Sequence, residues 1–232
     1  DLVRSRGLGD VYKRQVIATP MPTVSGITVM LDSGANSNSK PKHLVQGALM
    51  GSEYAKLLLG KEEPTVGLLN IGEEATKGND VVLATYPILE RMKTINFKGN
   101  IEGRDIPKGV VDVVVCDGFV GNVVLKFAEG LVTGLTQLVK DSIMAGSIFA
   151  KIGAMLVKPA LKKMAKRLDH TENGGAPLLG VNGVFMIAHG SSKAKEIKTA
   201  IEIASDLVER KIIQHIRETM DIEGALKYDY DE

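Results

Sequence analysis

The chain has 232 residues, of which 44% are hydrophobic and 25% are charged, and its formal net charge is +1. This near-neutral balance is typical of globular proteins and does not indicate a nucleic-acid partner, which would require a strongly basic surface. The single cysteine, with no signal-peptide pattern, predicts a reducing, cytoplasmic setting. No run reaches the roughly 20 apolar residues that span a bilayer, so we expect any membrane contact to be peripheral.

The first fifteen residues differ from everything that follows them. They are polar and basic and show no sustained periodicity. We expect residues 1–15 to be a non-native or disordered leader, with a genuine flexible arm as the alternative, and residues 16–232 to form a partial α/β domain.

From residue 16 onward, short apolar runs alternate with helical patterns. We expect strands at residues 16–18, 27–31, 66–70, 95–97, 113–116 and 184–188, and helices at residues 41–59, 82–92, 122 to the 140s and 197–208. Pro20 and Pro22 should end the first strand, and Pro87 should bend the second helix. Strands that alternate with helices predict an α/β fold built on a doubly wound, mostly parallel sheet.

The stretch from Asp112 to Glu129 is the most informative part of the chain. Residues 113–116 are apolar without alternation, as in a strand that is covered on both faces. Asp117-Gly118 then signals a turn, and Gly121-Asn122 leads into a helical pattern. A strand, a glycine-rich loop and a helix start can together hold an anion. A tight connection without a ligand is the alternative.

The segment from Ile148 to Leu168 mixes apolar residues with six cations. With the preceding helix it predicts a protruding helical hairpin over about residues 130–172, with a bend at Gly153 and Pro159. Apolar residues bounded by lysines suit the surface of an anionic bilayer. The residues expected to contact the membrane are Ile148, Phe149, Ile152, Met155 and Leu156. Packing of these residues in a dimer core is the more ordinary alternative.

Six separate stretches carry a resemblance to one family. They are G-L-L-N-I-G-E-E from Gly67, K-G-N from Lys77, N-I-E-G-R-D-I-P from Asn100, V-V-V-C-D-G-F-V-G-N-V-V-L-K from Val113, G-G-A-P-L-L-G-V-N-G from Gly174 and A-H-G-S-S from Ala188. Through these stretches the chain resembles, from about Ile17 to Glu209, the PlsX family, the phosphate acyltransferases of bacterial phospholipid synthesis. The family's opening strand and its Asp-Ala-Met-Gly-Gly-Asp loop are absent, so we expect an N-terminally truncated member that is inactive alone.

The resemblance implies a three-layer fold like that of the isocitrate and isopropylmalate dehydrogenases, related to the phosphotransacetylases. It implies transfer of a fatty acyl group from acyl carrier protein to inorganic phosphate, which forms acyl phosphate without a cofactor. It also implies a cytoplasmic homodimer that contacts the membrane peripherally. The product would pass to a glycerol-3-phosphate acyltransferase.

Three other classes of protein stay open at this stage. Another acyl-phosphate transferase of the phosphotransacetylase type and a nicotinamide-dependent dehydrogenase share the expected fold. A non-catalytic scaffold at the membrane surface would also keep the basic hairpin. The dehydrogenase is disfavoured, because its metal-binding aspartates and its adenine-site signature are missing from the sequence.

By the resemblance, Lys77 and Asn122 are the catalytic residues. Lys77 would offset the charge of phosphate and of the oxyanion, and Asn122 would donate to the thioester oxygen. A solvated loop lysine and a helix N-cap are the respective alternatives. The residues expected to bind substrate are Asn70, Gly72, Asn79, Asp117, Gly118, Gly121, His189, Gly190, Ser191 and Ser192. The last four open a helix, where N–H and hydroxyl groups can hold phosphate or simply cap the helix.

Two further features carry weaker expectations. Residues 32–36 (D-S-G-A-N) form a similar loop at the end of a strand, but the following Ser37-Asn38 departs from the family's usual Val-Asp. Cys116 lies in an apolar strand, where cysteine is usually an inert small hydrophobe, so we do not expect a covalent acyl-enzyme. The histidines and carboxylates show no metal-ligand spacing, and we expect no metal site.

Overall fold

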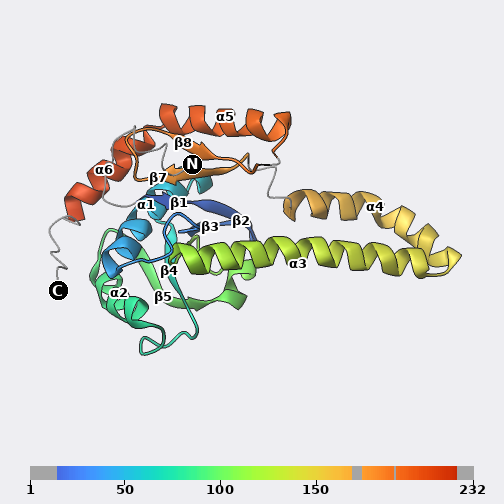
Figure 1. Ribbon diagram of the computed structural model, residues 1–232, viewed down its shortest axis with the longest axis horizontal. Helices are drawn as coiled ribbons and strands as arrows, with labels where there is room; N and C mark the ends of the chain where they lie inside the picture. The colour runs from blue at the N-terminus through green and yellow to red at the C-terminus, as the bar shows by residue number, and fades with distance from the viewer. Residues whose placement is uncertain (1–14, 169–173, 191, 224–232) are drawn as a thin grey trace.

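A computed structural model describes residues 15–168, 174–190 and 192–223. Its main sheet has five strands in the order β2-β3-β6-β4-β5 (Figure 1). These strands are β2 (Thr19–Pro22), β3 (Ile27–Leu31), β6 (Val113–Val115), β4 (Thr65–Asn70) and β5 (Asn96–Glu102). Strands β3, β6, β4 and β5 run parallel to one another, and β2 is antiparallel to β3. The predicted, mostly parallel sheet is confirmed.

Two strand boundaries differ from the prediction. Pro20 and Pro22 do not interrupt sheet pairing but lie in β2, at the sheet edge, where a residue without an N–H is tolerated. Strand β5 continues to Glu102, five residues beyond the predicted end at residue 97, and a 3-10 helix, η2 (Gly103–Lys108), follows it. The sequence pattern underestimates the length of β5, because β5 is an edge strand and contains polar residues that an apolar pattern does not detect.

Helices cover both faces of the main sheet. They include α1 (Pro41–Leu59), α2 (Asp80–Arg91), α3 (Gly118–Ala145) and α6 (Ile212–Glu223). Leu31 and Val115 are buried in the cluster that α1, α2 and α6 share with one face. Met30 and Val114 are buried in a second cluster, with the start of α3 and η2 on the other face. Neighbouring strand residues thus alternate between two cores, which confirms the three-layer arrangement.

A second, smaller sheet departs from the prediction. It is antiparallel, with the order β1-β7-β8, and contains β1 (Val16–Ile17), β7 (Ala176–Leu179) and β8 (Phe185–Ile187). The strand predicted at residues 184–188 is present as β8, and Met186 packs against the main core, but the strand pairs with β7 and not with the main sheet. Helix α5 (Ala194–Glu209) follows, and α6 is separate from it, where the sequence predicted one final helix. A short apolar run indicates a buried strand but not the partner with which it pairs.

Helices α3 and α4 (Ile148–Leu168) form an arm that protrudes from the body of the molecule (Figure 1). The structure contains the predicted hairpin, but its limits differ. Helix α3 begins at Gly118, because Asp117 caps it, and not at Asn122. The turn between the helices lies at residues 146–147, and α4 continues through Pro159 instead of being divided there.

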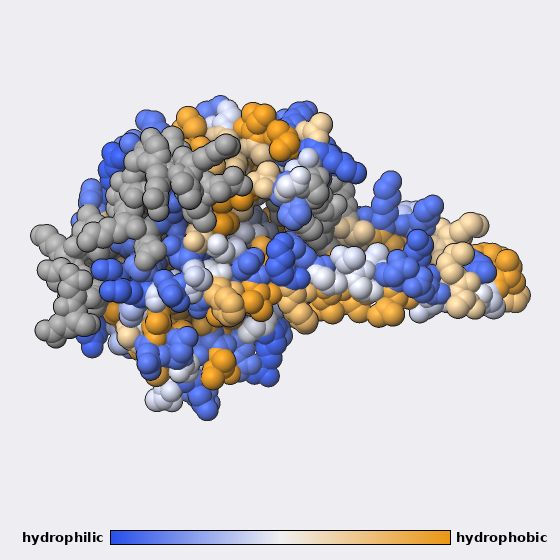
Figure 2. Space-filling view, viewed as in Figure 1, coloured by the Kyte–Doolittle hydropathy of each residue, from blue (hydrophilic) through white to orange (hydrophobic). Residues whose placement is uncertain are grey.

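One side of the arm is apolar and exposed, as Figure 2 shows along the underside and at the tip of the arm. The exposed apolar residues of α3 recur every three or four positions, so they form one stripe. This α3 stripe consists of Phe119, Val123, Phe127, Leu131, Leu135, Leu138 and Val139. On α4 the exposed apolar residues are Ile148, Phe149, Ile152, Met155, Leu156, Val157, Leu161 and Met164. A contiguous apolar surface of this kind indicates an interaction site.

By length and composition alone, α3 could also cross a membrane, contrary to the expectation from uninterrupted apolar runs. Glycines, threonines and the charges of Lys126 and Glu129 interrupt its apolar residues, and an unbroken run is therefore not visible. However, the first turns of α3 pack on the main sheet through Val120 and Val124. Because of this packing, we interpret α3 as part of an arm at the surface of the protein and not as a membrane-spanning helix.

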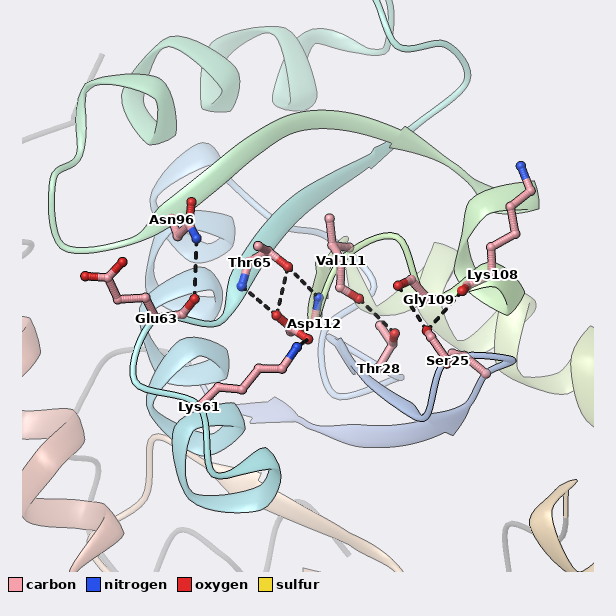
Figure 3. A network of polar contacts seen from close by, with 11 residues as sticks. Ser25, Thr28, Lys61, Glu63, Thr65, Asn96, Lys108, Gly109, Val111 and Asp112 are labelled. Atoms are coloured by element: carbon pink, nitrogen blue, oxygen red, sulfur yellow. Dashed lines mark hydrogen bonds and ion pairs between the residues drawn. The ribbon is translucent and has the colours of Figure 1, made fainter.

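Asp112 ties together the amino ends of β4 and β6 (Figure 3). Its carboxylate accepts hydrogen bonds from the N–H and the hydroxyl of Thr65, both at 2.9 Å, and forms an ion pair with Lys61. Its own N–H donates to the Thr65 hydroxyl oxygen at 2.9 Å. Burial raises the pKa of the Asp112 carboxyl, but the hydrogen bonds from Lys61 and Thr65 outweigh it, so this pKa lies below its ordinary value.

Asp112→Asn is expected to lower the free energy of unfolding near neutral pH by about 2 kcal/mol, because hydrogen bonds to a charged acceptor are lost. The pKa of Asp112 is lower in the folded than in the unfolded state. Its contribution is therefore present above the unfolded pKa of about 4 and is lost as the pH falls through the folded pKa. Urea unfolding of both proteins at several pH values should show their difference shrinking towards acid.

Asp206→Asn is the control for this pH series, because it removes an exposed ion pair with Arg210. It should change the free energy of unfolding by less than about 0.5 kcal/mol at every pH. If the effect of Asp112→Asn does not depend on pH, the carboxylate of Asp112 does not stabilise the fold through its charge.

Candidate active site

The carboxyl ends of β3, β6 and β4 lie side by side at one edge of the main sheet. Leu31 pairs with Val115, and Val115 pairs with Leu68, so β3 and β6 end together and β4 continues two residues further, to Asn70. The segments that follow are the loop at residues 32–36, the start of α3, and the loop at residues 71–79. Open α/β sheets bind their ligands at such an edge, where the strand order reverses.

Asp32 organises the loop after β3, and its side chain is buried. Its Oδ1 accepts hydrogen bonds from the N–H groups of Ile17, Gly34 and Ala35 at 2.9 to 3.1 Å. Its Oδ2 accepts from the N–H and the side-chain amide of Asn36, at 2.8 and 2.9 Å. Five donors around one carboxylate offset the cost of removing it from water and fix the course of the loop.

Gly118 and Gly121 allow α3 to approach this Asp32 loop closely. The Gly118 N–H donates to the Asn36 carbonyl at 2.8 Å, and a Cβ at Gly118 would lie 2.5 Å from the same oxygen. A Cβ at Gly121 would overlap the carbonyl oxygen of Asp32. Both glycines, which we expected to bind substrate, are buried. Their role in the structure is to let the helix and the loop meet.

Asp117, and not Asn122, caps α3, since its Oδ1 accepts from the N–H groups of Phe119 and Val120 at 3.0 and 2.9 Å. Asn122 lies in the second turn and is exposed, and its side chain has no hydrogen bond to the described part of the chain. A Cβ at Gly34 would lie 3.4 Å from the Asn122 Cγ, so the amide lies against the Asp32 loop. An amide with open donors at this edge can stabilise a developing oxyanion.

Two buried amides hold the loop after β4. Asn70 donates to the Lys77 carbonyl, and Asn100 of β5 donates to the Glu74 carbonyl, each at 2.9 Å. Asn79 caps α2 through its side-chain oxygen. Asn70 and Asn79, expected to bind substrate, therefore support the loop, while Lys77 is exposed to solvent.

Two glycines bring the Lys77 loop back onto the end of β4. Gly72 is buried, and a Cβ there would lie 3.2 Å from the Cγ of Lys77. Gly78 has a φ of +112°, and a Cβ there would lie 2.7 Å from the Asn70 Oδ1. Neither position leaves room for a side chain, and the loop consequently holds Lys77 near the strand end.

The H-G-S-S segment follows β8 of the smaller sheet and not a strand of the main sheet. His189 and Gly190 are exposed, and Ser191 lies outside the described residues. The Ser192 N–H donates to the His189 carbonyl at 2.9 Å. The N-cap of α5 is Lys193, so Ser192 does not cap this helix. Phosphate contact by the segment stays a prediction.

Cys116 is buried at the end of β6, and its Sγ lies 3.7 Å from the Asp32 carbonyl oxygen. Burial raises the pKa of its thiol well above the ordinary value, and the nearby carboxylates of Asp117 and Asp32 add to this effect. The thiol is therefore protonated and a poor nucleophile, as the sequence predicted. Within the described ranges, no group of three or more His, Cys, Asp and Glu residues could hold a metal ion.

The sequence alone predicts no firm role for Asp32 and none for Asn100. A signal for Asp32 was present, because an aspartate followed by glycine and asparagine at a strand end is typical of a turn that the carboxylate stabilises. No comparable signal marks Asn100, which supports a loop that follows another strand. Its role depends on the pairing of β4 with β5, and short-range patterns do not show which strands pair.

Comparisons with known proteins point to one family. The family model described as "Fatty acid synthesis protein" matches residues 3–215. Proteins named phosphate acyltransferase from Heliobacterium modesticaldum, Desulfitobacterium hafniense and Pelotomaculum thermopropionicum are 54%, 52% and 52% identical over 91%, 92% and 94% of this chain. The chain spans 63%, 64% and 65% of the length of these relatives.

Among solved structures, the EutD phosphotransacetylase from Staphylococcus aureus is similar over 52% of this chain and 43% of its own chain. The sequence identity is 17% and the TM-score is 0.42, a likeness too distant to bear on function. The family match covers most of the chain, including the strand ends and loops described above. The chain therefore belongs to the fatty acid synthesis protein family, in which relatives that are about half identical to it are named phosphate acyltransferase.

Proposed function

We propose that this chain is part of a phosphate acyltransferase that transfers a fatty acyl group from the thioester of acyl carrier protein to inorganic phosphate. The observation that carries the proposal is the Asn122 amide, which lies with open donors against the Asp32 loop at the ligand-binding edge of the sheet. Lys77, in a neighbouring loop, supplies a positive charge for two anionic substrates. The similar relatives named phosphate acyltransferase support the same activity.

In this reaction one phosphate oxygen attacks the thioester carbonyl carbon, and the carbon–sulfur bond then breaks. The departing thiolate takes the proton that phosphate gives up, so the products are acyl phosphate and the free thiol of the carrier. Phosphate is already ionised near neutral pH, so no general base is needed. The site has to hold two anions together and to stabilise the tetrahedral oxyanion. Asn122 would donate to that oxyanion, Lys77 would offset its charge, and the H-G-S-S segment would contact phosphate.

One assay separates this function from its alternatives. A protein of full family length that carries this sequence should form acyl phosphate from a long-chain acyl carrier protein thioester and phosphate. Acetyl-coenzyme A in place of that thioester tests the phosphotransacetylase type, and reduction of a nicotinamide cofactor tests the dehydrogenase. Binding to liposomes without any acyl phosphate formation would favour the non-catalytic scaffold.

Lys77→Ala is expected to lower kcat in this assay by about 10²-fold, because the charge that develops in the transition state loses its partner. The free energy of unfolding should stay nearly constant, since the Lys77 side chain is exposed. Lys93→Ala is the matched control, because Lys93 is an exposed lysine before the amino end of β5, away from the strand ends. Equal rates for the two variants would remove Lys77 from the mechanism.

We further propose that the arm makes two contacts, one with a second copy of the chain and one with the membrane. The α3 stripe would pack against a second copy and form a homodimer. The tip of the arm and α4 would face an anionic membrane, because Lys151, Lys158, Lys162 and Lys163 are exposed beside the apolar residues. Such a protein is cytoplasmic and peripherally bound. Acyl phosphate is lipid-like and labile in water, so release at the membrane would help it reach a glycerol-3-phosphate acyltransferase.

Ile152→Glu combined with Leu156→Glu is expected to abolish binding to anionic liposomes and to leave the dimer intact. Both side chains are exposed, at 47% and 78%, so two carboxylates there would oppose the membrane without disturbing the fold. Leu135→Glu with Leu138→Glu in the α3 stripe should do the reverse and yield a monomer in sedimentation. Dissociation of the dimer by the α4 pair would show that the arm tip belongs to the dimer core.

A further inference from the structure

We propose that Asp32 is a positioning residue for the Asn122 amide and acts through the loop that it folds. Asp32 accepts hydrogen bonds from five donors, and four of them belong to residues 34–36 of its own loop. The fifth is the N–H of Ile17, at the end of β1. The carboxylate therefore joins the smaller sheet to the active-site edge of the main sheet and determines where the loop lies.

The loop contacts the first turns of α3 at two places. The Asn36 carbonyl accepts the Gly118 N–H at 2.8 Å, which fixes the first residue of the helix. Gly121 packs directly on the Asp32 backbone, where no side chain would fit. These contacts fix the helical turn from which the Asn122 side chain projects.

The same loop also lies under the Asn122 side chain. From the position of a Cβ at Gly34, the Cγ, Cβ and Oδ1 of Asn122 lie 3.4, 3.5 and 3.6 Å away. An exposed asparagine on a helix samples several rotamers, and the Asn122 amide has no hydrogen bond to the described residues that would select one. Contact with the loop at Gly34 is the restraint that the structure provides. Since an oxyanion donor acts only when it is aligned in advance, this restraint matters for the chemistry.

The inference rests on the proposed function only for the catalytic meaning of the amide, and its test has a readout that does not depend on activity. In protein labelled with ¹⁵N-asparagine, the side-chain NH₂ signals of Asn122 are identified by their loss in Asn122→Asp. Asp32→Asn replaces one accepting oxygen by a donor that faces the Asn36 N–H. We expect the NH₂ signals of Asn122 to move towards those of a solvated amide in this variant.

Asp112→Asn is the matched control, because it alters another carboxylate with several donors, at the opposite edge of the sheet. It should leave the NH₂ signals of Asn122 unchanged even where it lowers stability. If Asp32→Asn does not fold, a second variant, Gly34→Ala, tests the position of the Asn122 amide, and Gly26→Ala is its control. Gly34→Ala strains the backbone at φ +131°, beneath Asn122. Gly26→Ala strains the backbone at a similar φ of +144°, in the hairpin before β3, and no atom lies within 4 Å of the position that its Cβ would take.

In protein of full family length, Asp32→Asn and Gly34→Ala should lower kcat by about 10²-fold, as expected for a misplaced catalytic group, with the KM for phosphate nearly constant. Unmoved NH₂ signals of Asn122 in a folded Asp32→Asn or Gly34→Ala protein would overturn the inference. If the unaltered protein makes no acyl phosphate, the proposed function fails, but the NH₂ signals still test the role of Asp32.

Discussion

Asn122→Ala is expected to lower the kcat of acyl transfer by about 10²- to 10³-fold, the loss typical for removal of one oxyanion donor. The KM for phosphate should change little, because the amide acts on the thioester oxygen and not on phosphate. Stability should be unchanged or slightly higher, since Asn122 is exposed and alanine has the greater helix propensity. Steady-state kinetics of acyl phosphate formation, with urea unfolding of the same samples, measures both effects.

Gln137→Ala is the control for Asn122→Ala, because it also removes an exposed amide from α3. Gln137 lies about four turns further along the helix, and its side-chain amide donates to the Asp141 carboxylate at 2.7 Å. It should leave kcat unchanged. If Asn122→Ala retained a rate close to that of Gln137→Ala, the amide would not stabilise the oxyanion, and the observation that carries the proposed function would be lost.

Gly121→Ala is expected to have the largest effect on stability, a loss of about 3 kcal/mol in the free energy of unfolding. The added methyl group would overlap the Asp32 carbonyl oxygen and lie 3.0 Å from the Cys116 Sγ. Overpacking usually costs about 1 to 3 kcal/mol, and the upper end applies here because the obstructing atom belongs to the backbone of a buried loop and cannot rotate away. Denaturant unfolding monitored by circular dichroism measures the loss.

Gly130→Ala gives the comparison for this effect within the same helix. No atom lies within 4 Å of the position that its Cβ would take. This substitution should raise the free energy of unfolding by about 0.5 to 1 kcal/mol, the usual gain when alanine replaces glycine in a helix. Similar stability of Gly121→Ala and Gly130→Ala would show that α3 does not need its close approach to the Asp32 loop.

The sequence predicted well what depends on neighbours along the chain. Helix α1 begins at Pro41 and ends before Gly60, which has the left-handed φ of 65° expected for a helix stop. Val113–Val115 forms the buried central strand that an uninterrupted apolar run indicates. Local chemistry sufficed in both cases because a proline, a glycine or a run of valines restricts the backbone wherever the chain folds.

What the sequence did not predict depends on contacts between distant segments. The residues at 184–188 have the composition of a core strand, but they pair with β7 in a second, antiparallel sheet and not with a strand of the main sheet. Asp117 and Asn122 are both good N-caps, and only the position of the first helical turn against Asn36 shows which of them caps α3. The candidate site was therefore located through family motifs, while the residues that fix its geometry required the fold.

Helix α3 joins the candidate site to the arm tip without a break, and this continuity has a mechanical consequence. The helix has 28 residues, so it extends about 42 Å from a start that is clamped between Asp117 and the Asp32 loop. Asn122 lies only about 6 Å from that clamped end. A tilt of about 10° around the clamp would therefore move the tip by about 7 Å and Asn122 by about 1 Å. Any displacement of the arm tip about this clamp is therefore reduced about sevenfold at the Asn122 amide, because Asn122 lies so near the clamped end of the helix.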